Sequence, residues 1–167
     1  YTSMLTKGFA ERSISVGVQN VCNESSGAFT GEISAEMAVD SGATYGLVGH
    51  SERRCLFGES DGLVAEKFVA CQRAGLTPVL CVGESLEERL EGRAESVVAG
   101  QIDAVIQHAG IKAFANAVIA YEPGWAIGTG ETARPDQAQS MHAFIRAFLT
   151  KSDATTAKNT RVLYGGS

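Results

Sequence analysis

Five short runs of apolar and β-branched residues recur along this chain, with starts about 30 to 45 residues apart. None of them alternates strictly between apolar and polar residues, which is typical of strands buried on both faces of a parallel sheet. The runs are Ile14–Gln19, Tyr45–Val48, Thr77–Val82, Ala117–Tyr121 and Arg161–Tyr164. They predict five strands of one parallel sheet.

Amphipathic helical segments lie before and between these runs. Asp61 is placed to cap one of them, Gly75 and Gly110 are placed to end two, and the aliphatic stem of Lys67 counts toward an apolar side. The expected helices are Thr2–Phe9, Ser34–Ser41, Asp61–Ala74, Arg93–Ala109 and one that begins at Pro135. The alternation of strands and helices predicts an α/β fold.

The whole chain, 1–167, is expected to form a single domain, because no linker or low-complexity stretch divides it. Two architectures fit the alternation, an open doubly wound sheet and a (β/α)8 barrel. No Gly-x-Gly-x-x-Gly follows the first run, which argues against a dinucleotide-binding fold.

Composition excludes several classes of function. The net charge is −5 and no basic cluster exceeds the pair Arg53–Arg54, so nucleic acid is not an expected partner. No apolar run approaches the roughly 18 residues needed to span a bilayer, so no membrane partner is expected either. Four cysteines lack metal-ligand spacing and are expected as reduced, buried thiols of a cytoplasmic protein without a metal or cofactor: Cys22, Cys55, Cys71 and Cys81.

Polar groups and glycines follow each run, at the edge where parallel α/β proteins carry their functional residues. Glu122 ends a run, is followed by Pro123, and precedes a stretch rich in Gly, Ala and Thr. A carboxylate beside a loop that can close over it is a candidate general base, although a solvated loop residue is the commoner alternative. His50 also follows a run. A helix N-terminus there favours the neutral imidazole, whereas a structural histidine is the alternative.

Two further segments suggest binding roles. Gly165-Gly166-Ser167 and Gly128 offer backbone N–H groups that suit a phosphate, although Gly-Gly-Ser is also a common turn. The segment Asn20–Ile33 has few helix or strand signals, and long loops of this kind are usually functional or interfacial. Phe29 is an apolar residue near its centre and either packs on its own domain or contacts a partner.

These motifs together resemble the triosephosphate isomerase family. The resemblance covers the whole chain in family order and spacing. It is carried by Ser26–Ser34 (SGAFTGEIS), Tyr45–Arg54 (YGLVGHSERR), Ala120–Pro123 (AYEP) with Thr129-Gly130, and Tyr164–Ser167 (YGGS).

The resemblance implies a TIM barrel and a reaction. The family interconverts dihydroxyacetone phosphate and glyceraldehyde 3-phosphate, a step of glycolysis and gluconeogenesis, through an enediolate. Glu122 matches the general base, and His50 matches the neutral imidazole that polarises the carbonyl. Ser51 and Glu52 match residues beside them.

The same resemblance assigns a lid, a phosphate site and a dimer contact. Ala126, Ile127 and Gly128 match the tip of the lid, and Tyr164 matches a residue that holds it closed. The phosphate-binding positions are Gly128 and Ser167. A homodimer is implied through Asn20–Ile33 if the full barrel is present, with Phe29 and Thr30 in the loop that reaches the neighbouring subunit.

The sequence departs from the family in extent. The family barrel has about 250 residues and eight strands. The five expected strands correspond to strands three to seven, so the first two and the eighth are absent, with the Asn-x-Lys pair of the first. The chain therefore resembles an internal fragment. Gly124 stands where the family usually has a bulkier hinge residue, which predicts a looser hinge.

Two alternatives to an active isomerase stay open. The 167 residues alone could be an incomplete, catalytically inactive fragment, because five strands cannot close an eight-stranded barrel. Another phosphate-binding barrel enzyme is the second alternative. An aldolase-like enzyme is disfavoured because no expected strand carries a lysine for a Schiff base.

Overall fold

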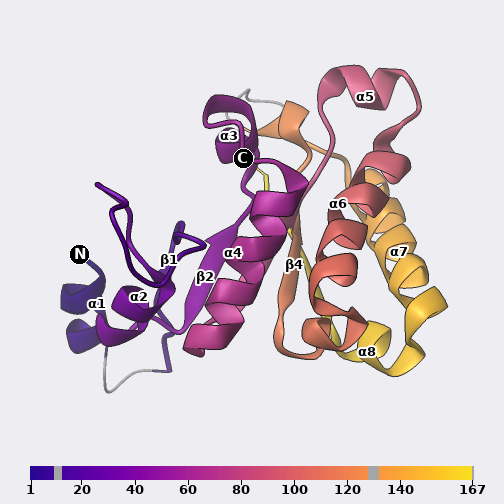
Figure 1. Cartoon of the computed structure of the whole chain (residues 1–167). Helices are drawn as coiled ribbons and strands as arrows, with labels where there is room; N and C mark the ends of the chain where they lie inside the picture. Colours follow the sequence, from indigo (N-terminus) through magenta and orange to yellow (C-terminus); the bar gives the residue numbers. More distant parts are fainter. Residues whose placement is uncertain (10–12, 128–131, 167) are drawn as a thin grey trace.

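Five parallel strands form the centre of the computed structural model, which describes residues 1–9, 13–127 and 132–166 (Figure 1). Their order in space follows their order in the chain, β1-β2-β3-β4-β5. The strands are β1 (Gly17–Val18), β2 (Tyr45–Val48), β3 (Thr77–Val82), β4 (Val118–Tyr121) and β5 (Arg161–Tyr164). The predicted parallel sheet is therefore confirmed.

The first strand is shorter than predicted. Only Gly17 and Val18 pair with β2, opposite Tyr45 and Gly46, whereas the sequence predicted a strand over Ile14–Gln19. Ile14 is half exposed and lies outside the pairing. Burial, which stabilises an apolar strand, is incomplete at this edge of the sheet, so the apolar pattern overstated the length of β1.

Helices connect the strands. The five predicted helices are present, together with short ones that the sequence did not predict in full. The helices are α1 (Thr2–Gly8), α2 (Ala35–Asp40), α3 (Ser51–Leu56), α4 (Asp61–Ala74), α5 (Leu86–Leu90), α6 (Ala94–Ala109), α7 (Pro135–Ser152) and α8 (Ala154–Asn159), with 3-10 turns η1 (Ile111–Asn116) and η2 (Gly124–Ala126).

The ends of α4 show how local sequence sets these bounds. Ser60 caps the helix, its hydroxyl accepting from the N–H of Leu63, and Asp61 is the first helical residue. The prediction that Asp61 caps α4 was wrong by one position, because serine and aspartate both suit a cap. Gly75 ends the helix in the left-handed region at φ 92°, as predicted.

The core lies between the sheet and the helices α4, α6 and α7 (Figure 1). All four residues of β4 are buried, because β4 is flanked by β3 and β5. β5 is mostly exposed, with Leu163 at 49% and Tyr164 at 39%, because it pairs on one side only in the part of the chain that is described. The prediction of strands buried on both faces thus holds in full for β4, in part for β2 and β3, and was wrong for the edges.

No helix among the described residues is long and apolar enough to cross a membrane.

Candidate active site

His50 and Glu122 converge at one edge of the sheet. His50 follows β2 and is the N-cap of α3, and Glu122 follows β4 directly. Because the strands are parallel, their carboxyl ends meet at the same edge, where α3 and the segment after β4 lie (Figure 1). His50 Nε2 lies 3.6 Å from Glu122 Oε2. The structure therefore brings the two predicted residues together.

The N-cap hydrogen bond of α3 determines which ring nitrogen of His50 carries the proton. His50 Nδ1 accepts a hydrogen bond from the backbone N–H of Glu52 at 3.3 Å, so Nδ1 carries no proton in this geometry. The neutral ring then has its proton on Nε2, which faces Glu122. In this tautomer of the neutral ring, an N–H donor points toward Glu122.

Glu122 is a buried carboxylate with an unused oxygen. Its side chain is 10% exposed, and Oε2 is buried without a hydrogen-bond partner in the described part of the chain. Burial raises the pKa of Glu122 above its ordinary value, and this outweighs the opposing effects of His50, the Cys81 thiol, the Ser51 backbone and Arg54. A raised pKa and a free oxygen are properties of a general base.

Two glycines make room for this carboxylate. A Cβ at Gly83 would overlap the carbonyl oxygen of Glu122, and a Cβ at Gly165 would lie 3.0 Å from Glu122 Cγ. The N–H of Glu122 donates to the carbonyl of Val82 at 2.7 Å, which continues the β3–β4 pairing past the end of β4. The sheet itself thus holds the backbone of Glu122.

Cys81 is a neighbour of Glu122 that sequence reasoning missed. Its thiol is buried in β3 beside the Glu122 carboxylate, and its Sγ donates to the carbonyl of Val79 at 3.9 Å. Burial raises the pKa of this thiol, and the charge of Glu122 raises it further, so Cys81 stays protonated and acts as a donor. Its place inside an apolar strand gave no sign of this contact.

A second buried carboxylate, Glu84, holds the start of the predicted lid. Glu84 is fully buried and accepts hydrogen bonds from Tyr121 Oη (3.0 Å), Trp125 Nε1 (3.0 Å) and Arg89 Nη1 (2.9 Å). The N–H of Gly124 donates to the Glu84 carbonyl at 2.9 Å. Glu84 lies just after β3, and the sequence did not predict its contacts with the lid base.

The remaining predicted site residues fall in two groups. Ser51 and Glu52 form the first turn of α3, beside His50, and Tyr164 Oη accepts from the N–H of Ala133 at 3.3 Å. Ala126 and Ile127 follow the lid base, with Ala126 buried. Gly128 and Ser167, the two predicted phosphate-binding residues, lie outside the described residues.

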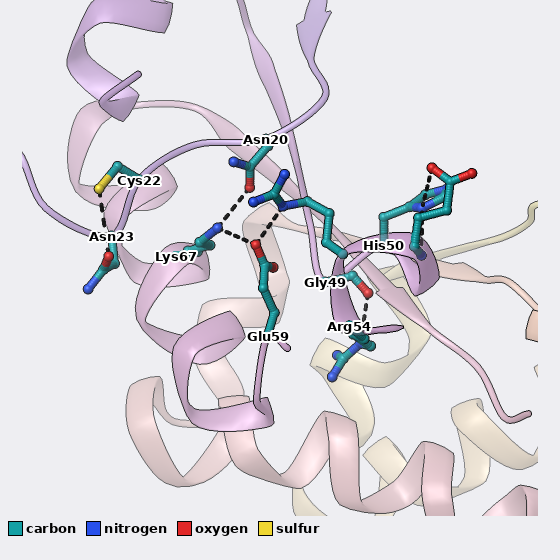
Figure 2. A network of polar contacts seen from close by, with 10 residues as sticks. Asn20, Cys22, Asn23, Gly49, His50, Arg54, Glu59 and Lys67 are labelled. Atoms are coloured by element: carbon teal, nitrogen blue, oxygen red, sulfur yellow. Dashed lines mark hydrogen bonds and ion pairs between the residues drawn. The ribbon is translucent and has the colours of Figure 1, made fainter. Parts of the chain in front are cut away.

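A charged cluster adjoins the site on the side of β1 (Figure 2). One oxygen of the buried Glu59 accepts from Arg53 Nε (2.5 Å) and Lys67 Nζ (2.6 Å), and Lys67 Nζ also donates to Asn20 Oδ1 (2.9 Å). The Lys67 head group is buried as well as its stem, so counting this lysine by its stem alone was incomplete. The cluster joins α3 and α4 to the first residue of the Asn20–Ile33 loop.

That loop is largely exposed beyond its base. Its ends are joined by the Cys22 N–H, which donates to the carbonyl of Ile33 at 2.8 Å. Phe29 is 46% exposed and Thr30 is exposed. Phe29 also lines a 300 Å³ cavity with residues of α3 and α4, so it lies partly against its own domain, and its contact with a partner stays a prediction.

We looked for a metal site and for a cavity that includes the pair. Among residues 1–9, 13–127 and 132–166, no group of three or more His, Cys, Asp and Glu side chains is arranged to hold a metal ion. A cavity of 860 Å³ lies between α3, α5 and the lid base, and its lining includes neither His50 nor Glu122. We therefore place the candidate site on the geometry of His50 and Glu122.

The fold and this pair define a class: parallel β/α proteins with a histidine and a glutamate side by side at the carboxyl edge of the sheet. The family model for triosephosphate isomerase matches residues 1–167. The chain belongs to the triosephosphate isomerase family, and its sheet is part of a TIM barrel.

Relatives in several bacteria support this assignment. The triosephosphate isomerase of Thiobacillus denitrificans is 57% identical over the whole chain, and that of Xanthomonas campestris pv. campestris is 54% identical over the whole chain. That of Alcanivorax borkumensis is 54% identical over 92% of the chain. The chain spans about two thirds of the length of these relatives, 67%, 66% and 62% respectively.

Proposed function

We propose that this chain carries the proton-transfer residues of a triosephosphate isomerase, which interconverts dihydroxyacetone phosphate and glyceraldehyde 3-phosphate. The observation that carries the proposal is the approach of His50 Nε2 to within 3.6 Å of Glu122 Oε2, a buried oxygen that accepts no hydrogen bond from the described residues. A glutamate base with a neutral histidine is the arrangement known for this enzyme.

Glu122 is the general base in this proposal. Its Oε2 takes the proton from the carbon next to the substrate carbonyl, and the electrons of the broken C–H bond form the C=C bond of an enediolate. The proton then returns to the neighbouring carbon, which converts ketose to aldose. Burial supports this role because it raises the pKa of the carboxyl group and so makes the carboxylate a stronger base.

His50 is the electrophile. The enediolate oxygens need a donor as negative charge develops on them, and the Nε2–H of His50 faces the same small space as Glu122. The neutral imidazole donates its Nε2 proton to one enediolate oxygen and takes a proton back from the other, so the proton moves between the two oxygens. Ser51 and Glu52 hold the turn that aims the ring.

The lid completes the site. In this proposal Ala126, Ile127 and Gly128 close over the substrate, Gly128 and Ser167 donate N–H groups to its phosphate, and Tyr164 steadies the far end of the lid. The contact from the Ala133 N–H to Tyr164 Oη supports the last role. Closure excludes water from an enediolate that would otherwise lose phosphate.

We further infer a cytoplasmic protein that forms a homodimer when the barrel is complete. Four free thiols support the location. Cys22, Cys71 and Cys81 are buried as expected, whereas Cys55 is exposed, so the expectation of a buried thiol was wrong there. The exposed Phe29 and Thr30, on a loop joined to α3 through Asn20 and the Glu59 cluster, support a contact through Asn20–Ile33.

An inactive 167-residue fragment is the second candidate. The open edges of β1 and β5 favour it, because a site assembled from the ends of several barrel strands loses precision when the barrel is not closed. We expect a polypeptide of these 167 residues alone to show little or no turnover.

A hybrid barrel tests both candidates. In the hybrid barrel, the 167 residues of this chain replace the corresponding two thirds of the Thiobacillus denitrificans relative. A coupled assay should find isomerase turnover in the hybrid barrel and little in the 167-residue polypeptide. The proposed function is wrong if the hybrid barrel folds and is inactive, and the fragment reading is wrong if the polypeptide alone matches it.

A further inference from the structure

Arg54 makes three contacts that meet at the base of the site. Its Nε donates to the carbonyl of Gly49 at 2.7 Å, a contact drawn in Figure 2. Its Nη1 donates to Asp61 Oδ1 at 2.5 Å, and its Nη2 to the carbonyl of Cys81 at 3.5 Å. The side chain is only 16% exposed. One guanidinium therefore joins the end of β2, the end of β3 and the start of α4.

Two of these contacts are to residues that adjoin His50 or Glu122. Gly49 directly precedes His50, so a bond to its carbonyl fixes the peptide plane from which His50 begins. Cys81 carries the thiol that lies beside Glu122, and its neighbour Val82 accepts the N–H of Glu122. Arg54 thus braces the backbone beneath both members of the pair.

Gly49 and Arg54 are fitted to each other. Gly49 has φ 74°, a conformation that residues with a side chain rarely adopt. A Cβ there would also lie 2.9 Å from Arg54 Nη2 and 2.7 Å from Val64 Cγ1. The guanidinium therefore occupies space that the glycine leaves empty.

We propose that Arg54 is a positioning residue that sets the approach of His50 to Glu122, with Asp61 orienting its guanidinium. The catalytic consequence rests on the proposed function, whereas the positioning itself does not. Only a planar fork of donors reaches two carbonyls and a carboxylate at once, and the single ammonium of a lysine does not.

Arg146 offers a matched control. Its guanidinium, on α7, also braces backbone carbonyls, those of Ala157 and Thr160, but at α8 and the turn that follows it. Arg54→Lys and Arg146→Lys therefore remove the same kind of brace from two places. A purely structural role predicts the same consequences for both.

The experiment reads the tautomer of His50 in the 167-residue chain labelled with 15N-histidine. The three histidines are assigned with His50→Gln, His108→Gln and His142→Gln. In the unaltered chain the two ring nitrogens of His50 should have well-separated shifts, because Nδ1 only accepts and Nε2 carries the proton. In Arg54→Lys the two shifts should move toward each other as the ring loses its fixed tautomer, while those of His142 stay.

Arg146→Lys should leave the His50 shifts in place although it also lowers the free energy of unfolding. The proposal is overturned if the His50 shifts are unchanged in folded Arg54→Lys, or if they move equally in Arg146→Lys. If Arg54→Lys fails to fold, Asp61→Asn is measured in the same way. A smaller difference between the two ring-nitrogen shifts of His50 supports the proposal, and an unchanged difference overturns it.

A kinetic measurement separates this proposal from the proposed function. In the hybrid barrel, Arg54→Lys should lower kcat by about 10- to 100-fold with little change in KM, because a small misplacement of the reacting groups slows the chemical step. A hybrid barrel without any isomerase activity would refute the proposed function. The His50 shifts would still decide whether Arg54 positions the ring.

Discussion

Gly83 is needed because the backbone of Glu122 passes directly against it. A Cβ at this position would overlap the Glu122 carbonyl oxygen, and neither backbone can move without breaking the β3–β4 pairing. The amide of Gln101 also forms hydrogen bonds with both the N–H and the carbonyl of Gly83. Two fixed backbones thus meet at the base of the site.

We predict that Gly83→Ala lowers the free energy of unfolding by about 2 to 3 kcal/mol, since the added atom meets backbone and not a movable side chain. Gly100→Ala is the control, because a Cβ there meets nothing within 4 Å and lies in α6. It should raise stability by about 0.5 to 1 kcal/mol. Urea unfolding measures both, and equal effects would contradict the packing shown here.

Burial of Glu122 makes stability depend on pH. Because the folded pKa is raised above the unfolded one, the folded state favours the protonated carboxyl group, and that contribution is lost as pH rises through the folded pKa. Relative to Glu122→Gln, which does not titrate, the unaltered chain should therefore become less stable as pH rises. Thermal unfolding across the acidic to neutral range measures the difference.

Glu52→Gln is the control for this experiment, because the Glu52 side chain is 67% exposed. It replaces an exposed carboxylate near the site and leaves the buried Glu122 in place. The raised pKa would be contradicted if the stability of the unaltered chain relative to Glu122→Gln were constant with pH or increased as pH rises.

At the scale of elements, sequence patterns predicted the features that depend on residues close together in the chain, such as the ends of helices. Gly75 ended α4 and Ser34–Ser41 enclosed α2 as expected, because caps and helical spacing are local. The parallel order let us expect His50 and Glu122 at one edge. The partners of Glu84, Glu59 and Cys81 were not predictable, because each contact joins segments that only the folded sheet brings together.

The hinge before the lid is an element whose freedom can be measured. Gly124 lacks a side chain, and a Cβ there would lie 3.1 Å from the Glu84 carbonyl oxygen. We predict that Gly124→Val restricts the hinge, because valine reduces the conformations open to the backbone. Trp125 is the single tryptophan and adjoins this position, so its fluorescence anisotropy should rise.

The same variant of the hybrid barrel should bind a triose phosphate about two- to fivefold more tightly, since less ordering is needed on closure. Unchanged anisotropy together with unchanged affinity would show that Gly124 does not loosen the hinge.

At the scale of the molecule, the open edges of the sheet favour association between copies of the chain. β1 and β5 each pair on one side in the described part of the chain, and Leu163 on β5 is 49% exposed. Unpaired strand edges promote association. We predict that the 167-residue polypeptide self-associates and that Leu163→Lys raises its dissociation constant at least about tenfold, a change of about 1.4 kcal/mol.

Leu90→Lys is the matched control, because Leu90 is 79% exposed on α5 and away from both edges. Sedimentation at several concentrations should show association unchanged in Leu90→Lys. Equal loss of association in both variants would mean that general surface hydrophobicity, and not the β5 edge, joins the copies.

Deuterium incorporation tests the central claim, that Glu122 and His50 act together on a carbon-bound proton. The hybrid barrel is incubated with dihydroxyacetone phosphate in D2O, and deuterium on carbon is followed by NMR. Exchange should be rapid in the parent hybrid, slower by about 100- to 10,000-fold in Glu122→Gln, and strongly reduced in His50→Gln. Rapid exchange that survives Glu122→Gln would contradict the account.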